Sequence, residues 1–467
     1  MTARETLITG PTFAEMLDPS RIDPRIRGRA LNAQKNDPLD PINLFNISWK
    51  DGCNRIYHMV LPRELTGVDA PIVVLYGKDF PTGSHKVGAT YSVLIEHVVK
   101  GLVDPARHTI VWPSTGNYGI GGAWVGCRMN FDSMVILPEE MSQERFEIVT
   151  RYGARLVLTP GCESNVKEIF DRCHDLKRRF PEKIVIMNQF EIMANYRFHA
   201  HVTGNTIVEL AAQLAEQGIG NGRVAAFVCA MGSAGTIAAG DRLKEVWPEH
   251  KIVGLEPIQC PTLFCNGYGG HDIQGIGDKH VTWIHNVMNM DCLMGIDDVA
   301  CKKGLQILTE QPGHAVLARR LGISPEQLAL LASIFGISGV CNLLGAIKTA
   351  KFYELGRDDL IVTVCTDAMD RYHSVMAQMN QAHGPLTESE AEVRLTAIFH
   401  GQRLDWIQEG DRLNRQRWHN LKYFTWVEQQ GKTVEALDAL KSQDFWQEQR
   451  REVAEVDRLI EEYRRLG

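Results

Sequence analysis

The sequence predicts a doubly wound α/β fold, and two observations carry this prediction. From about residue 71 onward, short β-branched runs alternate with longer amphipathic segments. The short runs are continuously apolar, which is typical of parallel strands covered by helices on both faces. The predicted strands are 71–77, 108–114, 132–138, 155–159, 183–189, 223–230, 251–257 and 359–366.

The segments between these strands have helical periodicity. The predicted helices are 87–100, 117–129, 142–153, 164–179, 194–216, 236–247 and 338–354. Local signals agree with the periodicity at one of them. Ser142 is placed to cap the helix that follows it, and Gly153 is placed to end that helix before the next strand.

The two ends of the chain differ from this middle part. Residues 1–46 are rich in Asp, Arg, Asn and Pro, and they predict an N-terminal arm laid over the body. Residues 385–467 are highly charged and lack βα alternation, which predicts a helical C-terminal extension. Its last segment has one apolar helical stripe, which packs either on the chain's own body or on a second subunit. The stripe consists of Val453, Val456, Ile460 and Tyr463.

The composition excludes several classes of protein. The chain has 467 residues, 44% hydrophobic and 23% charged, which is ordinary for a globular protein and unlike a disordered or fibrous one. The net charge is −7 with the charges scattered, so no nucleic-acid partner is expected. The longest uncharged run, 224–240, is interrupted by small polar residues, so no membrane partner is expected.

The cysteines and the start of the chain predict the compartment. Eleven cysteines form no CxxC pair and several lie in apolar runs, which indicates reduced thiols. The first residues lack the apolar stretch of a signal peptide. A cytoplasmic location is therefore expected. His271, His280 and His285 lie near one another in sequence, but no cysteine or carboxylate pattern accompanies them, so no metal site is predicted.

One lysine occupies an unusual position. Lys86 stands in DFPTGSHKVGATYS, at the start of a predicted helix, where the helix dipole disfavours a cation. A lysine held as a neutral imine escapes that cost, whereas a plain surface lysine is the alternative. The spacing of a Walker phosphate loop is absent.

Three further loops follow predicted strands, which is where open α/β sheets place ligands. WPSTGNYGIGGAW offers a carboxylate cradle or a capped turn, and CAMGSAGTIAAG offers a phosphate cradle or close helix–sheet packing. GGHDIQGIGDKH either lines a ligand-binding site or is simply a turn. An imine-forming lysine together with separate carboxylate and phosphate cradles is what pyridoxal phosphate chemistry requires.

At this point the sequence resembles a known family. PTGSHK, STGNYGIGGAW, MVILPEEMSQERFEIVTRYGARLVLTPG, GSAGTIAAGDRLK, IQGIG and GISGVCNLLGAIK are similar, in this order, to blocks of the fold-type II pyridoxal-phosphate enzymes. The resemblance is to the cysteine synthase and cystathionine beta-synthase family and covers roughly 47–375. It implies a tryptophan synthase beta-like fold of two doubly wound parallel-sheet domains with the cofactor between them.

The resemblance also implies roles for individual residues. Lys86 would hold pyridoxal 5'-phosphate as an internal aldimine and then remove the substrate Cα proton. The implied cofactor-binding residues are Lys86, Asn117, Gly232, Ser233, Ala234, Gly235, Thr236 and Thr366. The implied substrate-binding residues are Ser114, Thr115, Gly116, Tyr118, Gln189, Gly275 and Gly277. For the partner of the pyridine nitrogen, counting back from Arg371 reaches Asp367, and a shift of one residue reaches Thr366, which we prefer as the neutral partner.

The implied reaction takes place at Cβ of a small amino acid. Loss of a leaving group gives an aminoacrylate intermediate, to which a thiol or sulfide adds, or which water releases as pyruvate and ammonia. Residues 47–87 and 191–384 would form the large cofactor-binding domain, and 88–190 a small mobile substrate domain. The resemblance also implies a homodimer or a higher homo-oligomer.

The sequence departs from the family at a few positions, and these leave the substrate open. Val87 and Gly88 follow the lysine where the family usually has a polar residue. Tyr118 stands where the family commonly has threonine, which predicts an additional phenol near the substrate. The alternatives are a hydroxy-amino-acid dehydratase and, from another class, a catalytically silent binding or regulatory subunit. A nucleotide-binding dehydrogenase is disfavoured because GxGxxG is absent.

Overall fold

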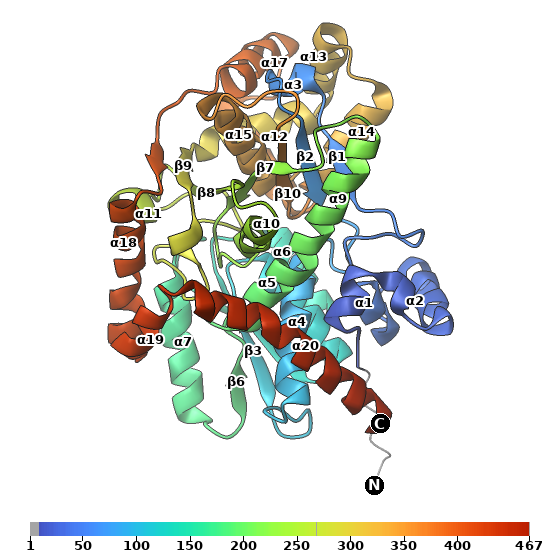
Figure 1. Ribbon diagram of the computed structural model, residues 1–467, viewed down its shortest axis with the longest axis vertical. Helices are drawn as coiled ribbons and strands as arrows, with labels where there is room; N and C mark the ends of the chain where they lie inside the picture. Colours follow the sequence, from blue (N-terminus) through green and yellow to red (C-terminus); the bar gives the residue numbers. More distant parts are fainter. Residues whose placement is uncertain (1–8, 268, 467) are drawn as a thin grey trace.

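The strands form two separate sheets in the computed structural model, which describes residues 9–267 and 269–466 (Figure 1). Residues 1–8 of the predicted arm lie outside this described part. The small sheet has the order β5-β4-β3-β6 and is parallel throughout. Its strands are β3 (Thr109–Pro113), β4 (Asp132–Pro138), β5 (Arg155–Thr159) and β6 (Ile184–Ile186).

The large sheet has the order β1-β2-β10-β7-β8-β9-β11. Its inner strands run parallel, and the two edge strands β1 and β11 are antiparallel to their neighbours. The strands are β1 (His58–Val60), β2 (Ile72–Tyr76), β7 (Val224–Ala230), β8 (Lys251–Pro257), β9 (Cys292–Ile296), β10 (Leu360–Cys365) and β11 (Ile407–Glu409).

Helices precede, connect and follow these strands. The first half of the chain contains α1 (Phe13–Leu17), α2 (Pro24–Asn36), α3 (Arg63–Thr66), α4 (Lys86–Val99), α5 (Asn117–Arg128), α6 (Gln143–Arg151), α7 (Val166–Arg179), α8 (Met193–Phe198) and α9 (Gly204–Glu216). The second half contains α10 (Ala239–Val246), α11 (Thr262–Cys265), α12 (Asp298–Thr309), α13 (Gln311–Leu321), α14 (Pro325–Ile334), α15 (Ile337–Phe352), α16 (His373–His383), α17 (Glu388–Arg394), α18 (Arg412–Asn420), α19 (Val434–Ala439) and α20 (Gln443–Leu466).

Shorter helical turns complete the fold. Turns of the 3-10 type lie at Pro19–Arg21, Pro41–Asn46, Thr236–Ala238, Val287–Asn289 and Met369–Arg371. Turns of the π type lie at His199–Thr203, Leu395–His400 and Phe424–Gln429.

Every predicted strand is present, and the doubly wound α/β prediction is confirmed. The sequence did not predict β1, β9 or β11. The prediction for Ser142 is wrong: its hydroxyl does not cap α6 but accepts a hydrogen bond from the Arg145 guanidinium at 2.9 Å. Gly153 follows the end of α6 with φ of +93°, as its predicted role requires.

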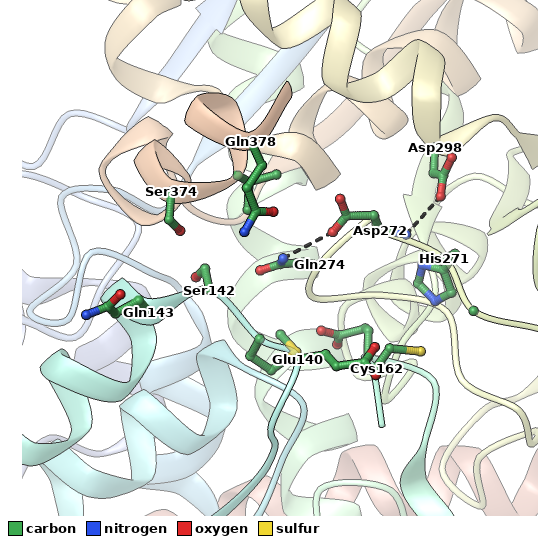
Figure 2. Close-up of a pocket in the computed structure, with 14 residues that line it drawn as sticks. Glu140, Ser142, Gln143, Cys162, His271, Asp272, Gln274, Asp298, Ser374 and Gln378 are labelled. Atoms are coloured by element: carbon green, nitrogen blue, oxygen red, sulfur yellow. Dashed lines mark hydrogen bonds between the residues drawn. The ribbon is translucent and has the colours of Figure 1, made fainter. Parts of the chain in front are cut away.

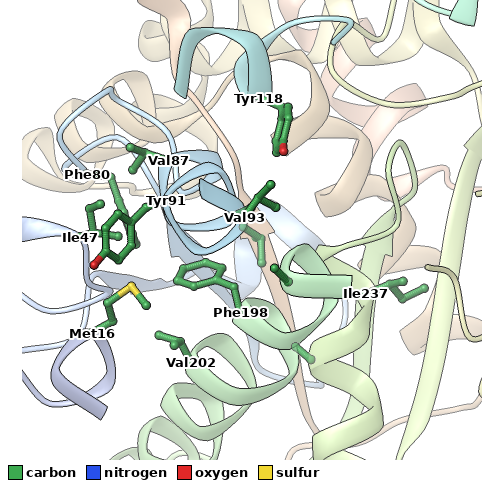
Figure 3. Close-up of a cluster of buried hydrophobic side chains, with 14 of the residues drawn as sticks. Met16, Ile47, Phe80, Val87, Tyr91, Val93, Tyr118, Phe198, Val202 and Ile237 are labelled. Carbon is green, nitrogen blue, oxygen red and sulfur yellow. The ribbon is translucent and has the colours of Figure 1, made fainter. Parts of the chain in front are cut away.

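Helix α4 is buried, and many of its side chains belong to the largest apolar cluster (Figure 3). Val87, Tyr91 and Val93 on this helix belong to the same cluster as Phe198, which ends α8. A Cβ at Gly88 would lie 2.0 Å from Cζ of Phe198, so no side chain fits there. Packing of two helices therefore explains why glycine follows the lysine turn.

The C-terminal helix α20 packs on the chain's own body. Val453, Val456 and Ile460 are buried in the same cluster as α4. The Asp457 carboxylate accepts hydrogen bonds from the backbone N–H of Phe13 and of Ala14, at 2.6 and 3.0 Å. The apolar stripe was predicted to pack either on the chain's own body or on a second subunit, and in the structure it packs on the body. The same helix also binds the N-terminal arm.

The C-terminal extension is not purely helical, which corrects the prediction. Strand β11 pairs antiparallel with β9 and extends the large sheet by one edge strand. Trp426 and Trp446 are buried in a cluster with Phe170 of α7 and Tyr196 of α8. The extension therefore contacts both the large sheet and the helix that covers the small one.

Within the described residues, no individual helix is both long and apolar enough to cross a membrane. Helices α14 and α15 pass that test only when taken together, and they are bent by 114° relative to each other.

Candidate active site

The predicted site residues lie at the carboxyl ends of parallel strands from both sheets. Lys86 is the first residue of α4, which follows β2, and Asn117 is the first residue of α5, which follows β3. The loop 232–236 follows β7, and Thr366 follows β10. The carboxyl ends of parallel strands are where open α/β sheets bind ligands, and the chain places its small-residue loops there.

Lys86 is buried between the two sheets. Its Nζ lies 3.5 Å from the Ser233 hydroxyl, so the lysine meets the loop predicted to hold phosphate. Burial lowers the pKa of Lys86, and the nearby Cys229, Asp278 and Glu163 oppose that shift. A lysine whose pKa is lowered is more often a neutral amine, the form that attacks a carbonyl.

The loop 232–236 has little room for side chains. A Cβ at Gly232 would lie 3.1 Å from the carbonyl oxygen of Gly275, and a Cβ at Gly235 would lie 2.2 Å from Oδ1 of Asn195. Ala234 has φ of +59°, in the left-handed region. The Ser233 hydroxyl accepts a hydrogen bond from the Asn195 amide at 3.1 Å. The loop therefore presents backbone amides at the start of a helix, as an anion site does.

His85 contacts this loop through a hydrogen bond, a role that was not predicted from the sequence. Its Nε2 is hydrogen-bonded to the Thr236 hydroxyl at 3.2 Å. The ring stacks on Trp49 with centroids 5.2 Å apart. Full burial keeps the pKa of His85 well below its usual value, with the Lys86 charge acting in the same direction, so the imidazole is neutral. Its position directly before the lysine was the available signal.

The loop that follows β3 is a tightly capped turn. The Ser114 hydroxyl accepts hydrogen bonds from the backbone N–H of Gly116 at 2.9 Å and of Gly119 at 2.8 Å. Gln189 is buried nearby, and its amide donates to the Pro113 carbonyl at 3.5 Å. Ser114 thus fixes the backbone of the turn, whereas Thr115 lies next to the Glu163 carboxyl.

Tyr118 is almost completely buried, and its place beside the substrate stays a prediction. Its hydroxyl donates to the backbone carbonyl of Met187 at 3.2 Å, and its ring meets Trp112 edge to face. Both contacts lie in the apolar core around α4, to which Tyr118 belongs (Figure 3). The Tyr118 side chain therefore occupies a position in the apolar core.

Asn117 belongs to a buried polar cluster that joins the two sheets. Its amide donates to the Asp367 carboxylate at 2.6 Å and accepts from the Arg371 guanidinium. Asp367 also accepts from the Tyr372 hydroxyl at 2.8 Å, and Nη2 of Arg145 lies 3.6 Å away. Arg145 comes from α6, beside the small sheet, and Asp367 follows β10 in the large one. Sequence reasoning did not single out Arg145.

Thr366 and Asp367 differ in their surroundings. Asp367 is fully buried, and the cluster above already holds its carboxylate. Thr366 is only partly buried, and within the described part of the chain its side chain makes no hydrogen bond. Of the two candidates, Thr366 is the one with free hydrogen-bonding capacity.

Two buried carboxyl groups next to Lys86 were not predicted. Asp278 follows Gly277 directly, and Glu163 lies in the loop after β5. Among the described residues, neither oxygen of either carboxyl meets a hydrogen-bond partner at good geometry. Burial raises the pKa of Asp278 to about 7 against the opposing effect of Lys86. Burial likewise raises the pKa of Glu163 well above its usual value, although Arg145 and the Thr115 hydroxyl oppose the shift.

The loop that carries Asp278 is shaped by its glycines. Gly275 and Gly277 have φ of +104° and +83°, conformations that favour glycine. The Gly277 N–H donates to the Met231 carbonyl at 2.8 Å, so the loop lies directly against the 232–236 loop. A Cβ at Gly275 would lie 3.8 Å from the Asn117 amide nitrogen. Gly275 and Gly277 therefore lie between the Asn117 turn and the phosphate-type loop.

A pocket of about 540 Å³ opens next to these groups (Figure 2). Glu140, Ser142, Gln143 and Cys162 face Gln274 and Asp272 across it. The remaining lining residues are Met141, Glu163, Gly270, His271, Asp298, Ser374, Val375 and Gln378. Glu163 lines this pocket and also acts on the pKa of Lys86, whereas Lys86 itself is not one of the residues that line the pocket.

Comparison with known proteins identifies the family. Residues 73–314 match the family described as "Pyridoxal-phosphate dependent enzyme". A probable cysteine synthase of Bacillus subtilis is 30% identical over 295 residues, which are 63% of this chain and 85% of the relative. A cysteine synthase of Staphylococcus aureus is 31% identical over 296 residues, which are 63% of this chain and 84% of that relative.

The solved structures agree with the sequence relatives. The O-acetyl serine sulfhydrylase isoform 3 of Entamoeba histolytica superposes with a TM-score of 0.59 at 25% sequence identity. The match covers 73% of this chain and 92% of that one. The fold is therefore that of the fold-type II enzymes, and about a quarter of this chain lies outside the part matched to that structure.

Proposed function

This chain belongs to the family of pyridoxal-phosphate-dependent enzymes, within its cysteine synthase branch, and we propose that it acts at Cβ of a small amino acid, as a lyase or as a β-replacing transferase. The observation that supports this most directly is the buried Lys86, with its lowered pKa, in contact with the phosphate-type loop. A silent binding subunit would not need to retain that arrangement.

The residues present fit the cofactor. A Cβ on Gly232 or Gly235 would meet neighbouring atoms, so the loop approaches its surroundings through its backbone. Beside it, Nδ1 of His85 and Oδ1 of Asn195 are buried and have no hydrogen-bond partner in the described part of the chain. Nδ1 of His85 can donate to a phosphate or its hydrating water in the tautomer that protonates it, whereas Oδ1 of Asn195, an acceptor, can bind only the water. Lys86 lies within reach of the same loop.

Each group of the chain has a proposed task. Bound pyridoxal phosphate supplies an electron sink that acidifies the Cα proton and allows a leaving group to depart from Cβ. Lys86 holds the cofactor and, as a neutral amine, takes the Cα proton. Thr115, Gly116 and Gln189 bind the substrate carboxylate, with Ser114 fixing their turn. Gly275 and Gly277 line the mouth of the site that faces the amino acid.

Asp278 is proposed as a second proton carrier. Its carboxyl is buried beside Lys86 and has a pKa of about 7. A group with a pKa near neutrality is suited to accept a proton from a thiol or water and to return it. We assign to Asp278 the proton of the co-substrate.

Domain closure is proposed to assemble this site. All small-sheet strands fall within 88–190, the proposed mobile domain, and the large-sheet strands fall outside it. The Glu144 carboxylate on α6 accepts hydrogen bonds from the backbone N–H and the hydroxyl of Ser374 on α16, at 2.8 and 2.7 Å. Together with the contacts of Arg145, these bonds would hold a closed state that excludes water.

An amino-acid panel tests the proposed function. We expect O-acetyl-L-serine or a cysteine thioether to be consumed with release of pyruvate and ammonia. We expect added sulfide or thiol to divert that flux into a new amino acid. Keto-acid release mainly from serine or threonine would favour the dehydratase instead. Absence of turnover with every donor, in enzyme loaded with cofactor, would overturn the proposal.

The partner of the cofactor's ring nitrogen can be tested separately. We propose Thr366, because Asn117, Tyr372 and Arg145 already engage Asp367. Thr366→Ala should shift the visible absorbance of the bound cofactor and lower the rate about tenfold, the worth of one hydrogen bond. Asp367→Asn should instead lower thermal stability, because it leaves Arg145 buried without its counter-charge. An unchanged Thr366→Ala spectrum and rate, with both lost in Asp367→Ala, would reverse the assignment.

We propose that the protein is a homodimer or a higher homo-oligomer located in the cytoplasm. The cysteines support a reducing compartment, because all of them are free thiols and most are buried. Sedimentation velocity of the purified protein would establish the number of subunits.

A further inference from the structure

Arg371 is a buried residue whose guanidinium connects two turns of the candidate site. It ends the 3-10 turn Met369–Arg371 after β10, and only 1% of it is exposed. Its Nη1 donates to Oδ1 of Asn117, and its Nη2 donates to the backbone carbonyl of Thr82, in the turn that precedes Lys86. One side chain therefore holds both the turn after β3, which carries Asn117, and the turn after β2, which carries the lysine.

The guanidinium packs closely against the lysine turn. Gly83 has φ of +70°, and a Cβ at this position would lie 3.0 Å from Nη2 of Arg371. A guanidinium is a planar fork that can donate to two acceptors in fixed, different directions, whereas the ammonium group of lysine is a point charge on a flexible stem. The contacts of Arg371 therefore require arginine and not merely a positive charge.

The positive charge of Arg371 has no counter-ion nearby. Within the described part of the chain, its guanidinium forms no ion pair within 4 Å, since the buried Asp367 is paired with Arg145. Its Nε also meets no acceptor among the described residues. Burying a cation in this way is costly, and the acceptors that compensate for it are the Asn117 amide oxygen and the Thr82 carbonyl. The charge therefore acts directly on the Asn117 amide.

Opposite charges fix the two ends of the Asn117 amide. Arg371 donates to Oδ1, and Nδ2 donates to the Asp367 carboxylate at 2.6 Å. If the amide were turned by 180°, its oxygen would face a carboxylate and its NH₂ group would face a guanidinium, so both hydrogen bonds would be lost. Nδ2 has a second hydrogen, and no residue of the described chain accepts it. The amide is thus held in one orientation with one donor unused.

We propose that Arg371 is a positioning residue, which orients the Asn117 amide so that the unused hydrogen is donated to the cofactor. The inference rests on the proposed function. Pyridoxal phosphate has acceptor oxygens on its phosphate and on its ring, and the loop 232–236 is proposed to hold the phosphate. The ring oxygen is then the acceptor for Asn117. Because the cation at Oδ1 polarises the amide, it also makes the N–H a stronger donor.

A double-mutant cycle with Arg371→Lys and Asn117→Ala tests whether Arg371 acts through Asn117. The readouts are the dissociation constant of pyridoxal phosphate and the visible absorbance of the bound cofactor, and neither needs a substrate. We expect Arg371→Lys to weaken cofactor binding about tenfold, the worth of one hydrogen bond, and to shift the absorbance. In the Asn117→Ala background, the same change should alter binding by less than about twofold and leave the absorbance unchanged.

A matched control measures the effect of losing any buried guanidinium. Arg394 on α17 is also buried, and it donates to Gln306 at 2.6 Å and to Glu390, neither of which belongs to the candidate site. Arg394→Lys should therefore leave the cofactor absorbance and its dissociation constant unchanged.

Chemical rescue supplies a second measurement that does not depend on how a lysine packs. Millimolar guanidinium added to Arg371→Ala should restore the wild-type absorbance, because it can occupy the vacated space and donate to the same two acceptors. Ammonium at the same concentration should not restore it, because it lacks the planar fork. Equal rescue by the two ions would overturn the role of the guanidinium.

The outcomes separate this inference from the proposed function. If the wild type binds the cofactor and turns over a donor, but Arg371→Lys has the same effect with and without Asn117, the function stands and the positioning role is refuted. An equal absorbance shift in Arg394→Lys would refute it as well. A wild type that binds no pyridoxal phosphate overturns the proposed function, and this inference with it.

Discussion

Replacing Lys86 with alanine is expected to lower turnover by at least about a thousandfold and to abolish covalent attachment of the cofactor. The physical reason is that Lys86 has two proposed tasks, holding the cofactor and taking the Cα proton, and the general-base task alone is worth about 10² to 10⁴. Borohydride reduction followed by peptide mass spectrometry measures the attachment. The wild type should carry the reduced label at residue 86, and the variant should carry none.

The Lys86→Ala variant is expected to fold. Because burial lowers the pKa of Lys86, the unfolded chain binds the proton more tightly than the folded one, and the charge opposes folding below the unfolded pKa. Removing the lysine removes that cost. Lys78→Ala is the matched control, since its Nζ donates to Ser333 at 2.8 Å, away from the site. A label that persists in Lys86→Ala on another lysine would refute the assignment.

Replacing Asp278 with asparagine is expected to lower kcat/KM for β-replacement by about 10² to 10⁴, the range of one general acid–base group. It should also remove an inflection of the pH profile near 7. Burial raises the pKa of Asp278 to about 7, and the groups that face it are Lys86, Glu163 and Cys260. As a base it works when ionised, so the wild-type rate should rise with pH through 7 and then level off.

The measurement is kcat/KM at saturating donor between about pH 5.5 and 9. Asp272→Asn, in the same loop but ion-paired with Lys302, controls for loss of a nearby carboxylate and should keep the inflection. Glu256 also has a pKa raised to about 7 by burial, but it binds the backbone N–H of Leu263 and Phe264. An inflection that survives Asp278→Asn would therefore assign the titration to another group.

Most of the architecture could be predicted because most helices and strands have a residue periodicity that can be recognised locally. The parallel strands are continuously apolar, and the helices between them are amphipathic, so each element is recognisable without its partners. Of the three strands that were missed, two lie at the edges of the large sheet. β1 and β11 are three-residue edge strands, and they exist only because β2 and β9 offer unpaired backbone groups to them.

The directions of side chains at the site could not be predicted from local sequence. Ser142 was predicted as a helix cap, and Tyr118 as a phenol beside the substrate. In the structure Arg145 takes the Ser142 hydroxyl, and the core around Trp112 takes the Tyr118 ring. Side-chain direction depends on which neighbours compete for the group, and those neighbours come from other elements.

By itself the sequence determined the fold class, the lysine turn, the phosphate-type loop and their order along the chain. These features depend on backbone conformation and on residues close in sequence. Only the tertiary structure decided that Glu163 and Asp278 meet at Lys86, and that Asp367 is already engaged by groups from both sheets. Electrostatic interaction depends on distance in space and on exclusion of water. These short distances and this exclusion of water arise only when the fold brings the loops after β5, β8 and β10 together.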